Sequence, residues 1–368
     1  MLLGLFTELL TPGGIQRVGR HAAAVLSTLA SDRDLPCRLL SLNDQPRAQR
    51  IALGELSLTV EGFGRDKMRF ARAALALTPH TRVAYVGHPN LATLGLLLRL
   101  AHPTLRYWVA THGLEVWVPL PITRCVGLRL ARGVTAPSRF TADAVRRQRF
   151  RPRNVQVVPW GLEPGFGHAA ALCGREALAP ASALLLLAVT RLEATERYKG
   201  IDTLIRVFPA VLRAVPRTYL VIVGDGNDRP WLQRLAQERG VADRVRFVGS
   251  VQDGELASYY RACDVFVMPS QKEGFGLVFL EAAAFGKPVV GGNHGGTPEI
   301  VQDGVTGFLV EHGDIGALAD RVICLLQSSE LRARMGEAGR QRVEENYLFR
   351  HFSGRLTHLL LEGEPCAS

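Results

Sequence analysis

The stretch of sequence that decides the fold lies at residues 264–282, where an apolar run, a glycine-containing loop and a second apolar run follow one another. It reads Asp264-Val265-Phe266-Val267-Met268-Pro269-Ser270-Gln271-Lys272-Glu273-Gly274-Phe275-Gly276-Leu277-Val278-Phe279-Leu280-Glu281-Ala282. The first run is typical of a buried strand, and the residues after Gly276 have the apolar spacing of a helix. A strand followed by a short loop and a helix is part of a βαβ unit, so this stretch predicts an α/β protein.

The same loop combines two acidic residues with small ones. The carboxylates of Glu273 and Glu281 can accept hydrogen bonds from sugar hydroxyls, and the backbone amides of the loop converge at a helix N-terminus, where an anion is favoured. The loop is therefore a candidate site for a phosphorylated sugar compound. The alternative is that Glu273 only caps the helix and that Glu281 is a solvated helical charge.

Outward from this stretch, short apolar runs alternate with helical patterns along the chain, as expected of parallel sheets with crossover helices. In the first half we expect strands at Leu2–Phe6, Pro36–Leu40, Leu56–Val60, Val83–Val86, Tyr107–Ala110, Val134–Ala136 and Val155–Val158, and helices at Gly14–Leu29, Asp66–Leu77 and Thr141–Arg149. In the second half we expect strands at Ser182–Thr190, Tyr219–Val223, Val245–Val248, Asp264–Met268 and Val289–Val290.

A turn-rich stretch at residues 159–167 interrupts the alternation and predicts an interdomain linker. The chain of 368 residues is long enough for two domains with separate cores. We therefore expect two doubly wound, Rossmann-like domains at residues 1–165 and 166–345, facing each other across a cleft. Their ligands are expected at the carboxyl ends of the strands.

Two basic residues follow the first strand expected in the second half, Arg191 directly and Lys199 in the sequence Arg197-Tyr198-Lys199-Gly200. A diphosphate leaving group gains negative charge as its bond to a sugar breaks, so fixed cations beside it are needed. Arg191 offers a planar fork for two phosphate oxygens, and Lys199 offers a compact charge. The alternative for Lys199 is a surface charge that flanks a helix.

Together, the basic pair Arg191 and Lys199 and the acidic pair Glu273 and Glu281 resemble the signature of the family 4 glycosyltransferases, which are retaining enzymes of GT-B fold. The resemblance implies that a hexose moves from a UDP- or GDP-linked sugar to a hydroxyl. It implies that Arg191 and Lys199 contact the diphosphate, Glu273 the donor sugar and Glu281 the ribose. It also implies that the last helix, within residues 346–368, crosses back onto the N-terminal domain.

Further donor contacts are implied by the resemblance. The family's N-terminal glycine loop corresponds to Thr11-Pro12-Gly13-Gly14, where two glycines let the backbone approach phosphate, although glycine is common in strand-to-helix turns. The residues expected to bind the donor are Gly13, Gly14, Gly274, Phe275, Gly276, Leu277, Val278, Glu281 and Val251.

His112 follows an expected strand, where the family carries a histidine at the cleft. The resemblance implies contact with the donor sugar near the reaction centre, so His112 joins Arg191, Lys199 and Glu273 as a catalytic candidate; the alternative is a histidine that only makes structural hydrogen bonds. Ser138 is expected to cap a helix. The candidates on the acceptor side are His88, Arg139, Arg65, Lys67 and Arg69.

The positive charge is concentrated in the first half of the chain. Residues 1–170 carry 22 Lys and Arg against 10 Asp and Glu, whereas residues 171–368 carry 22 against 24. Two runs dominate, namely Arg65, Lys67, Arg69 and Arg72, and Arg146, Arg147, Arg149, Arg151 and Arg153. This charge favours contact with an anionic membrane and a glycolipid or lipid-linked saccharide acceptor of cell-envelope polysaccharide synthesis. A solvated, arginine-rich face is the alternative, and nucleic acid is not expected because the runs lack interleaved aromatic residues apart from Phe70 and Phe150.

The composition indicates a cytoplasmic protein. No apolar run reaches about 18 residues, the least for a membrane span, and the six cysteines form no Cys-x-x-Cys pair. We expect no metal ion, because Asp32-Arg33-Asp34 reads as a solvated turn, and no cofactor besides the donor sugar nucleotide. The alternatives are a nucleotide-sugar epimerase, a glycosyl phosphorylase and a non-catalytic subunit that binds a nucleotide sugar.

Overall fold

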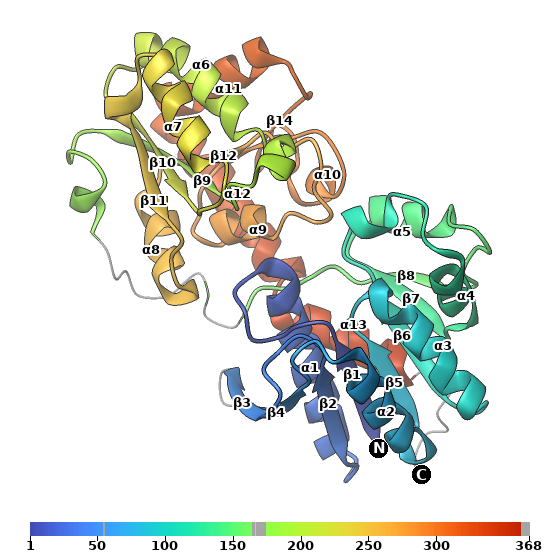
Figure 1. The fold of residues 1–368 in the computed structure, drawn as a ribbon. Helices are drawn as coiled ribbons and strands as arrows, with labels where there is room; N and C mark the ends of the chain where they lie inside the picture. Colours follow the sequence, from blue (N-terminus) through green and yellow to red (C-terminus); the bar gives the residue numbers. More distant parts are fainter. Residues whose placement is uncertain (54–55, 164–165, 167–173, 362–368) are drawn as a thin grey trace. The chain divides into compact units, whose positions relative to one another are not determined.

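The computed structural model describes residues 1–53, 56–163, 166 and 174–361. The chain divides into two compact units, the first formed by Met1–Gly161 with Phe349–Ser368 and the second by Leu162–Leu348 (Figure 1). The domain boundaries expected from the sequence, after residues 165 and 345, lie within a few residues of this division. Residues 164, 165 and 167 of the expected linker lie outside the described residues.

The first unit is built on an eight-stranded sheet of order β3-β4-β2-β1-β5-β6-β7-β8. Its strands are β1 (Leu2–Phe6), β2 (Cys37–Ser41), β3 (Ala48–Leu53), β4 (Leu56–Gly62), β5 (Val83–Val86), β6 (Arg106–Ala110), β7 (Gly133–Ala136) and β8 (Val155–Val157). All neighbouring strands pair in parallel except β3 with β4. Strand β1 lies inside the sheet and all its residues are buried, which explains its unbroken apolar run.

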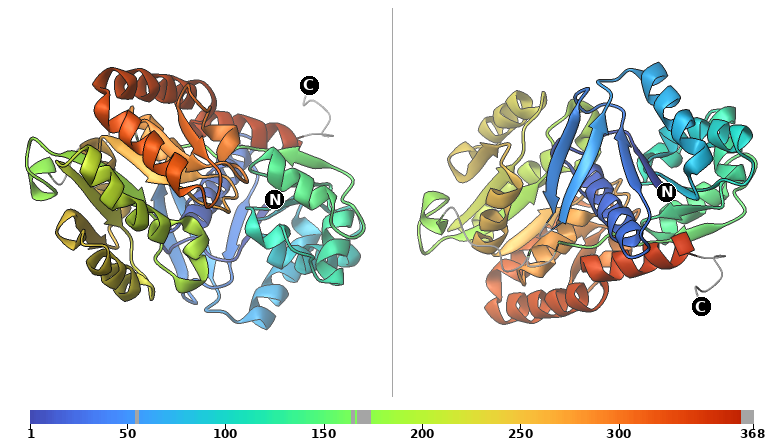
Figure 2. Two further views of the ribbon diagram at one scale, coloured as in Figure 1. Left: turned by 90° about the horizontal axis from the view of Figure 1, so that it is seen from above. Right: turned by 90° about the horizontal axis from the view of Figure 1, so that it is seen from below.

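The helices of the first unit are α1 (Gly14–Ser31), α2 (Lys67–Leu77), α3 (Ala92–Ala101), α4 (Ile122–Leu130), α5 (Arg139–Arg146) and α13 (Phe349–Leu361). The last of these packs on the first: His21 of α1 contacts the rings of Phe349 and Phe352, with centroids 5.2 and 6.2 Å apart. Figure 2 shows the two helices side by side, so the C-terminal helix belongs to the unit that the N-terminus begins.

The second unit is built on a six-stranded, all-parallel sheet of order β11-β10-β9-β12-β13-β14. Its strands are β9 (Leu184–Val189), β10 (Thr218–Val223), β11 (Val245–Gly249), β12 (Val265–Met268), β13 (Val289–Gly292) and β14 (Gly307–Val310). Its helices are α6 (Ile201–Ala214), α7 (Arg229–Glu238), α8 (Asp253–Ala262), α9 (Leu277–Ala284), α10 (Thr297–Ile300), α11 (Ile315–Gln327) and α12 (Ser329–Asn346).

Strand β12 shows that this second sheet is covered by helices on both faces. Val265 and Val267 pack in one cluster with residues of α6, α7 and α11. Phe266, between them, lies 5.7 Å from the rings of both Tyr260 in α8 and Phe279 in α9. Successive strand residues point to opposite faces, so the two sets of helices cover opposite faces of a doubly wound sheet.

Two strands were not expected from the sequence. In β3, half-buried and exposed residues alternate because it is the antiparallel edge strand, and its Gln49 and Arg50 interrupt any apolar run. Strand β14 follows a glycine-containing turn and itself begins with Gly307, so only three apolar residues mark it in the sequence. Neither strand changes the fold class that the sequence predicts.

Helix α5 also differs from the expectation of a helix at Thr141–Arg149. It begins at Arg139 because the hydroxyl of Ser138 accepts a hydrogen bond of 3.2 Å from the Thr141 amide, which confirms Ser138 as the cap. It ends at Arg146, and Phe150 and Arg151 have φ values of 67° and 28°, which a helix cannot contain. None of the helices among the described residues is long and apolar enough to cross a membrane.

Candidate functional site

The order of strands in the second sheet places two loops together. From β9 the chain proceeds to β10 and β11 on one side, then returns to β12 on the other side, where Val265 pairs with Leu186 and Phe266 with Leu187. Loops that leave the carboxyl ends of such a strand pair run in opposite directions and leave a crevice where ligands bind. Arg191 and Lys199 lie in the loop after β9, and Glu273 lies in the loop after β12.

Lys199 and Glu273 form an ion pair across this crevice. The Lys199 Nζ donates a hydrogen bond of 2.8 Å to the Glu273 Oε2, and the two side chains are only 18% and 15% exposed. Burial disfavours the ammonium charge, but the Glu273 carboxylate, its hydrogen bond, and the nearby Tyr198 and Glu196 outweigh burial and raise the pKa of Lys199 above its ordinary value. Lys199 is therefore a fixed cation throughout the neutral range of pH.

Gly200 brings the two loops close together. Its φ is 78°, in the left-handed region, and a Cβ added there would lie 2.7 Å from the Pro269 carbonyl oxygen. Next to this contact, the Gln271 amide donates a hydrogen bond of 2.7 Å to the carbonyl of Tyr198. A side chain at position 200 would push the loops apart and would separate the ion pair.

Arg191 lies at the same hollow but is far more accessible. It lines a depression together with Lys199, Glu193, Glu196 and Asp202. Its side chain is 76% exposed and pairs with Glu196. An exposed guanidinium with a single carboxylate partner can exchange that partner for a phosphate, so the structure brings Arg191 and Lys199 together as the sequence predicted.

Arg197, for which the sequence predicted no role, fixes the loop after β9. Its guanidinium donates hydrogen bonds of 2.6 and 2.9 Å to the two carboxylate oxygens of Asp228, which is buried. It also stacks 3.8 Å from the centre of the Trp231 ring. The Arg197 guanidinium, held by Asp228 and by the Trp231 ring, anchors the loop on α7. Arg197 and Asp228 are too far apart in the sequence for a local pattern to indicate this contact.

The loop before α9 reaches the helix with a free N-terminal turn. Gly276 is the N-cap with a φ of 95°, and no side chain caps the helix, which excludes the interpretation that Glu273 is only a cap. Leu277 and Val278 form the first turn, where amide groups favour an anion. The side chain of Phe275 is buried in the core, so Phe275 and Gly274 can offer a ligand only backbone atoms.

The turn before α10 packs against this loop. The Gly296 amide donates a hydrogen bond of 2.7 Å to the Glu273 carbonyl, and a Cβ at Gly296 would lie 2.6 Å from the Gly274 carbonyl oxygen. Val251, expected to bind the donor, follows β11, which is two strands away from β9. Its role stays a prediction.

Glu281 is buried on the second turn of α9, with 2% of its surface exposed. Its Oε2 accepts a hydrogen bond of 2.6 Å from the Tyr260 hydroxyl, and the Tyr260 ring stacks on Phe285 at 6.1 Å and 9°. The interpretation of Glu281 as a solvated helical charge is therefore wrong. Contact with a ribose stays a prediction, and it requires a sugar hydroxyl to reach a nearly covered carboxylate.

In the first unit, His112 lies directly after β6 and has one ring nitrogen to spare. Its Nε2 donates a hydrogen bond of 2.7 Å to the Gly87 carbonyl, and its amide donates one of 2.6 Å to Glu115. Its Nδ1 is buried and has no partner among the described residues. Because Nε2 donates to the Gly87 carbonyl, Nδ1 is the ring atom left to pair with a sugar hydroxyl.

His88 stacks on His112, with ring centroids 5.3 Å apart and an angle of 29° between the planes. Burial first, then the charges of His112 and Arg124, lower the pKa of His88 to about 3. Its Nδ1 accepts a hydrogen bond of 3.1 Å from the Asn90 amide. His88 is thus neutral and already engaged, and its proposed role on the acceptor side stays a prediction.

The remaining candidates of the first unit follow the carboxyl ends of strands in the first sheet. Gly13 caps α1 at a φ of 149°, next to Gly14, the first residue of α1. Arg139 begins α5 after β7. Arg65, Lys67 and Arg69 are exposed at the start of α2, after β4. Their roles stay predictions.

Among the described residues, no group of three or more His, Cys, Asp or Glu side chains gathers in a way that could hold a metal ion. Asp32 and Asp34 are exposed where α1 ends, as expected of a solvated turn.

Comparisons with known proteins identify relatives of this chain. A family model described as glycosyl transferases group 1 matches residues 177–342, the part that carries both charged pairs. A GDP-mannose-dependent alpha-(1-6)-phosphatidylinositol monomannoside mannosyltransferase from Mycobacterium tuberculosis is 35% identical over 286 residues, which is 73% of each chain. A D-inositol 3-phosphate glycosyltransferase from Streptomyces scabiei is 36% identical over 61% of this chain and 54% of its own.

Among solved structures, a sucrose-phosphate synthase from Thermosynechococcus elongatus aligns with a TM-score of 0.81 at 23% identity. The alignment covers 97% of this chain and 98% of that one. This likeness confirms the predicted GT-B fold with two Rossmann-like domains.

Proposed function

We propose, because this chain belongs to the glycosyl transferases group 1 family, that it is a retaining hexosyltransferase that needs no metal ion. It takes the hexose from a nucleoside diphosphate sugar and transfers it to a hydroxyl of a lipid-linked saccharide or glycolipid. We place this reaction at the inner face of the cell membrane, in the synthesis of a cell-envelope glycan.

The observation that carries the proposal is the Lys199–Glu273 pair at the crevice between β9 and β12. Before donor binds, each charge neutralises the other at 2.8 Å. A bound diphosphate offers Lys199 a stronger anion, with Arg191 beside it, and this releases Glu273 to accept hydrogen bonds from hydroxyls of the donor sugar. One pair of residues thereby holds both the phosphate and the sugar end of the donor.

Retention without an enzymic nucleophile fits this arrangement. A carboxylate that holds ring hydroxyls is poorly placed to attack the anomeric carbon, so we expect substitution on one face of the sugar. The leaving phosphate oxygen takes the proton of the acceptor hydroxyl while the bond to the anomeric carbon breaks. Lys199 and Arg191 stabilise the charge that develops on the diphosphate. These fixed cations supply the role that a divalent ion has in other enzymes.

The names of the relatives direct the choice of donor and acceptor. A relative at 35% identity is named as dependent on GDP-mannose and as acting on a phosphatidylinositol mannoside, and another is named for D-inositol 3-phosphate. Both acceptors contain an inositol ring and a phosphate. We therefore propose GDP-mannose as the first donor to test and a phosphoinositide glycolipid as the first acceptor, with UDP-linked hexoses as the second donors.

The test is turnover with a panel of GDP-mannose, UDP-glucose and UDP-N-acetylglucosamine, each with a phosphatidylinositol mannoside and with free inositol phosphate. We expect an α-linked product, identified by nuclear magnetic resonance, and the same rate after treatment with EDTA. An inverted linkage or a rate abolished by EDTA would refute the retaining, metal-free mechanism. Conversion of the donor in the absence of acceptor would indicate an epimerase. A requirement for inorganic phosphate would indicate a phosphorylase, and donor binding without turnover would indicate a non-catalytic subunit.

The matched variants are Lys199→Ala and Lys287→Ala. Lys199 lies in the crevice at the carboxyl end of the sheet, whereas Lys287 precedes β13 and therefore lies at the opposite, amino end. We expect Lys199→Ala to lower turnover about 10²–10³-fold, as for the loss of one preorganised group that stabilises developing charge. Lys287→Ala should keep the rate of the original protein.

A further inference from the structure

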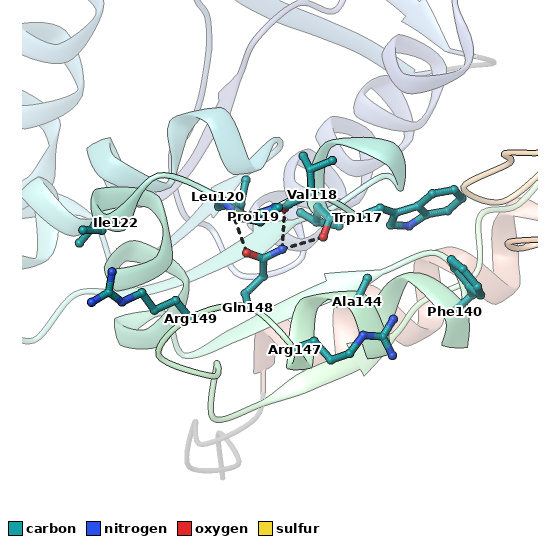
Figure 3. A pocket seen from close by; sticks show the side chains of 11 residues that line it. Trp117, Val118, Pro119, Leu120, Ile122, Phe140, Ala144, Arg147, Gln148 and Arg149 are labelled. Atoms are coloured by element: carbon teal, nitrogen blue, oxygen red, sulfur yellow. Dashed lines mark hydrogen bonds between the residues drawn. The ribbon is translucent and has the colours of Figure 1, made fainter. Parts of the chain in front are cut away.

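A cavity of the first unit, distant in sequence from the proposed donor site, has apolar walls and two arginines. Its volume is 620 Å³, within the range of roughly 300–1,000 Å³ typical of small-molecule sites. Its lining includes Trp117, Val118, Phe140, Ala144, Arg147 and Arg149. Figure 3 shows Trp117 and Phe140 at one end and Ile122 with Arg149 at the other.

The aromatic end of the cavity is fixed in place. The indole Nε1 of Trp117 donates a hydrogen bond of 3.3 Å to the Thr141 hydroxyl. The Trp117 ring meets Phe140 edge to face, with centroids 4.9 Å apart and an angle of 67°. Both rings therefore present a prepared apolar wall, and a ligand does not have to order them.

Gln148 holds the loop before α4, which carries Trp117, Val118 and Leu120 of the cavity lining. Its side chain is buried, and its amide nitrogen donates hydrogen bonds of 2.7 and 2.9 Å to the carbonyls of Val116 and Val118. Its amide oxygen accepts one of 3.0 Å from Leu120. Figure 3 shows these bonds between Gln148 and the loop. An irregular loop with its polar groups satisfied in this way is a built wall.

The mouth of the cavity combines exposed apolar groups with positive charge. Val118 and Ile122 are 58% and 55% exposed. Arg147 and Arg149 are exposed as well, and no carboxylate among the described residues pairs with either of them. An apolar hollow with two uncompensated guanidinium groups at its wall is complementary to a molecule with a hydrocarbon part and an anionic group.

We propose that this cavity, the Trp117–Gln148 pocket, binds the hydrocarbon chain of an anionic lipid, with Arg147 on its phosphate, because Figure 3 shows Arg147 on the side of Phe140 and Arg149 at the other end. The loop that lines the pocket comes after β6 and His112 in the chain, and α5 begins at the carboxyl end of β7. The pocket therefore lies at the edge of the sheet that carries His112. A lipid held here has its polar end at that edge. The identification of this lipid with the acceptor rests on the proposed function, but its binding can be measured without turnover.

The experiment measures the affinity of hexyl, octyl and decyl phosphate for the full-length protein, by calorimetry and by Trp fluorescence, below their critical micelle concentrations. We expect the dissociation constant to fall about fourfold for each methylene that becomes buried, the factor that corresponds to ~0.8 kcal/mol. Inorganic phosphate should not bind measurably at this site, and uncharged octyl glucoside should bind more weakly than octyl phosphate. Affinity that does not depend on chain length would overturn the proposal.

The variants separate the pocket from general attraction to a basic surface. Arg147→Gln with Arg149→Gln should weaken octyl phosphate about tenfold and leave octyl glucoside unchanged. Arg213→Gln with Arg217→Gln removes the same charge from exposed positions of the second unit and should change neither. An equal loss in both double variants would show non-specific attraction and refute the pocket.

Two further variants test the cavity itself. Ala144→Trp fills it from α5 and should abolish binding of both amphiphiles. Val118→Asp places a negative charge at the mouth, on a side chain that is 58% exposed, so its folding is not at risk and it should weaken octyl phosphate strongly. Unchanged affinity in Val118→Asp would overturn the proposal.

Lys199→Ala should bind alkyl phosphates as the original protein does while it loses turnover. Failure of the lipid site and failure of the proposed reaction are thereby told apart.

Discussion

Replacement of Lys199 by Met keeps an unbranched side chain and removes the charge that faces Glu273. The two charged atoms are 2.8 Å apart and the side chains are 18% and 15% exposed, so the variant leaves a carboxylate in a largely dry place without its cation. Removal of one partner from a fully buried pair costs about 3–5 kcal/mol. The remaining access of solvent lowers this to about 2–3 kcal/mol. For a unit of this size the melting temperature should fall by about 4–10 °C.

The double variant Lys199→Met with Glu273→Gln decides whether this reasoning holds. It removes both charges, so no charge is left unpaired and stability should return to within about 1 kcal/mol of the original protein. Turnover behaves differently: it should remain about 10²–10³-fold reduced, because no cation then stabilises the leaving diphosphate. The assays are thermal unfolding without ligand and release of nucleoside diphosphate. A double variant that melts as low as Lys199→Met would refute the coupling, and turnover at the original rate in Lys199→Met would remove Lys199 from the mechanism.

Three further perturbations follow from the geometry. Gly200→Ala should destabilise the protein by about 2 kcal/mol or more and weaken donor binding, because the φ of 78° and the carbonyl oxygen 2.7 Å from the added Cβ act together. The control Gly240→Ala, with a φ of 66° and no atom within 4 Å of the added Cβ, should cost only about 1 kcal/mol. Equal melting temperatures of the two variants would contradict this prediction. Burial and nearby positive charge lower the pKa of His88 to about 3. Below about pH 6.5 the unfolded chain therefore binds a proton at this position and the folded chain does not. The free energy of unfolding should fall by about 1.4 kcal/mol per pH unit towards pH 3. Denaturant titrations at pH 7.5, 6.5 and 5.5 should show this slope in the original protein and a smaller one in His88→Asn. Tyr260→Phe removes the 2.6 Å hydrogen bond to the buried Glu281 carboxylate and should cost about 1.5–3 kcal/mol in thermal unfolding; an unchanged melting temperature would mean that Glu281 finds another donor.

The sequence predicts most strands well because the second sheet is all-parallel and the first is parallel except where β3 pairs with β4. Strands such as Leu2–Phe6 and Val265–Met268 are then unbroken apolar runs, which a reader of the sequence can recognise. Edge and short strands give no such signal. Ala48–Leu53 pairs on one side only and mixes Arg with apolar residues, and Gly307–Val310 begins with a glycine that continues the preceding turn, so both escaped prediction.

The sequence predicts the charged pairs of the site but not how their charges are satisfied. The ion pair of Lys199 with Glu273 joins residues 74 positions apart, and the covered carboxylate of Glu281 depends on Tyr260 in another helix. Such contacts are set by which strands lie next to each other. Residue types indicate the chemistry available, whereas the order of strands decides which groups meet.

Gln148 has a consequence for how this protein could change its partners. A single amide fixes the backbone of the loop before α4 at three positions, a task that elsewhere falls to neighbouring strands. Because these bonds go to main-chain atoms, they are indifferent to the side chains that the loop carries. Substitutions at Val118 or Pro119 can therefore change the side chains that line the pocket without changing the backbone of the loop. New ligand specificity can be introduced at this loop only if Gln148 is kept.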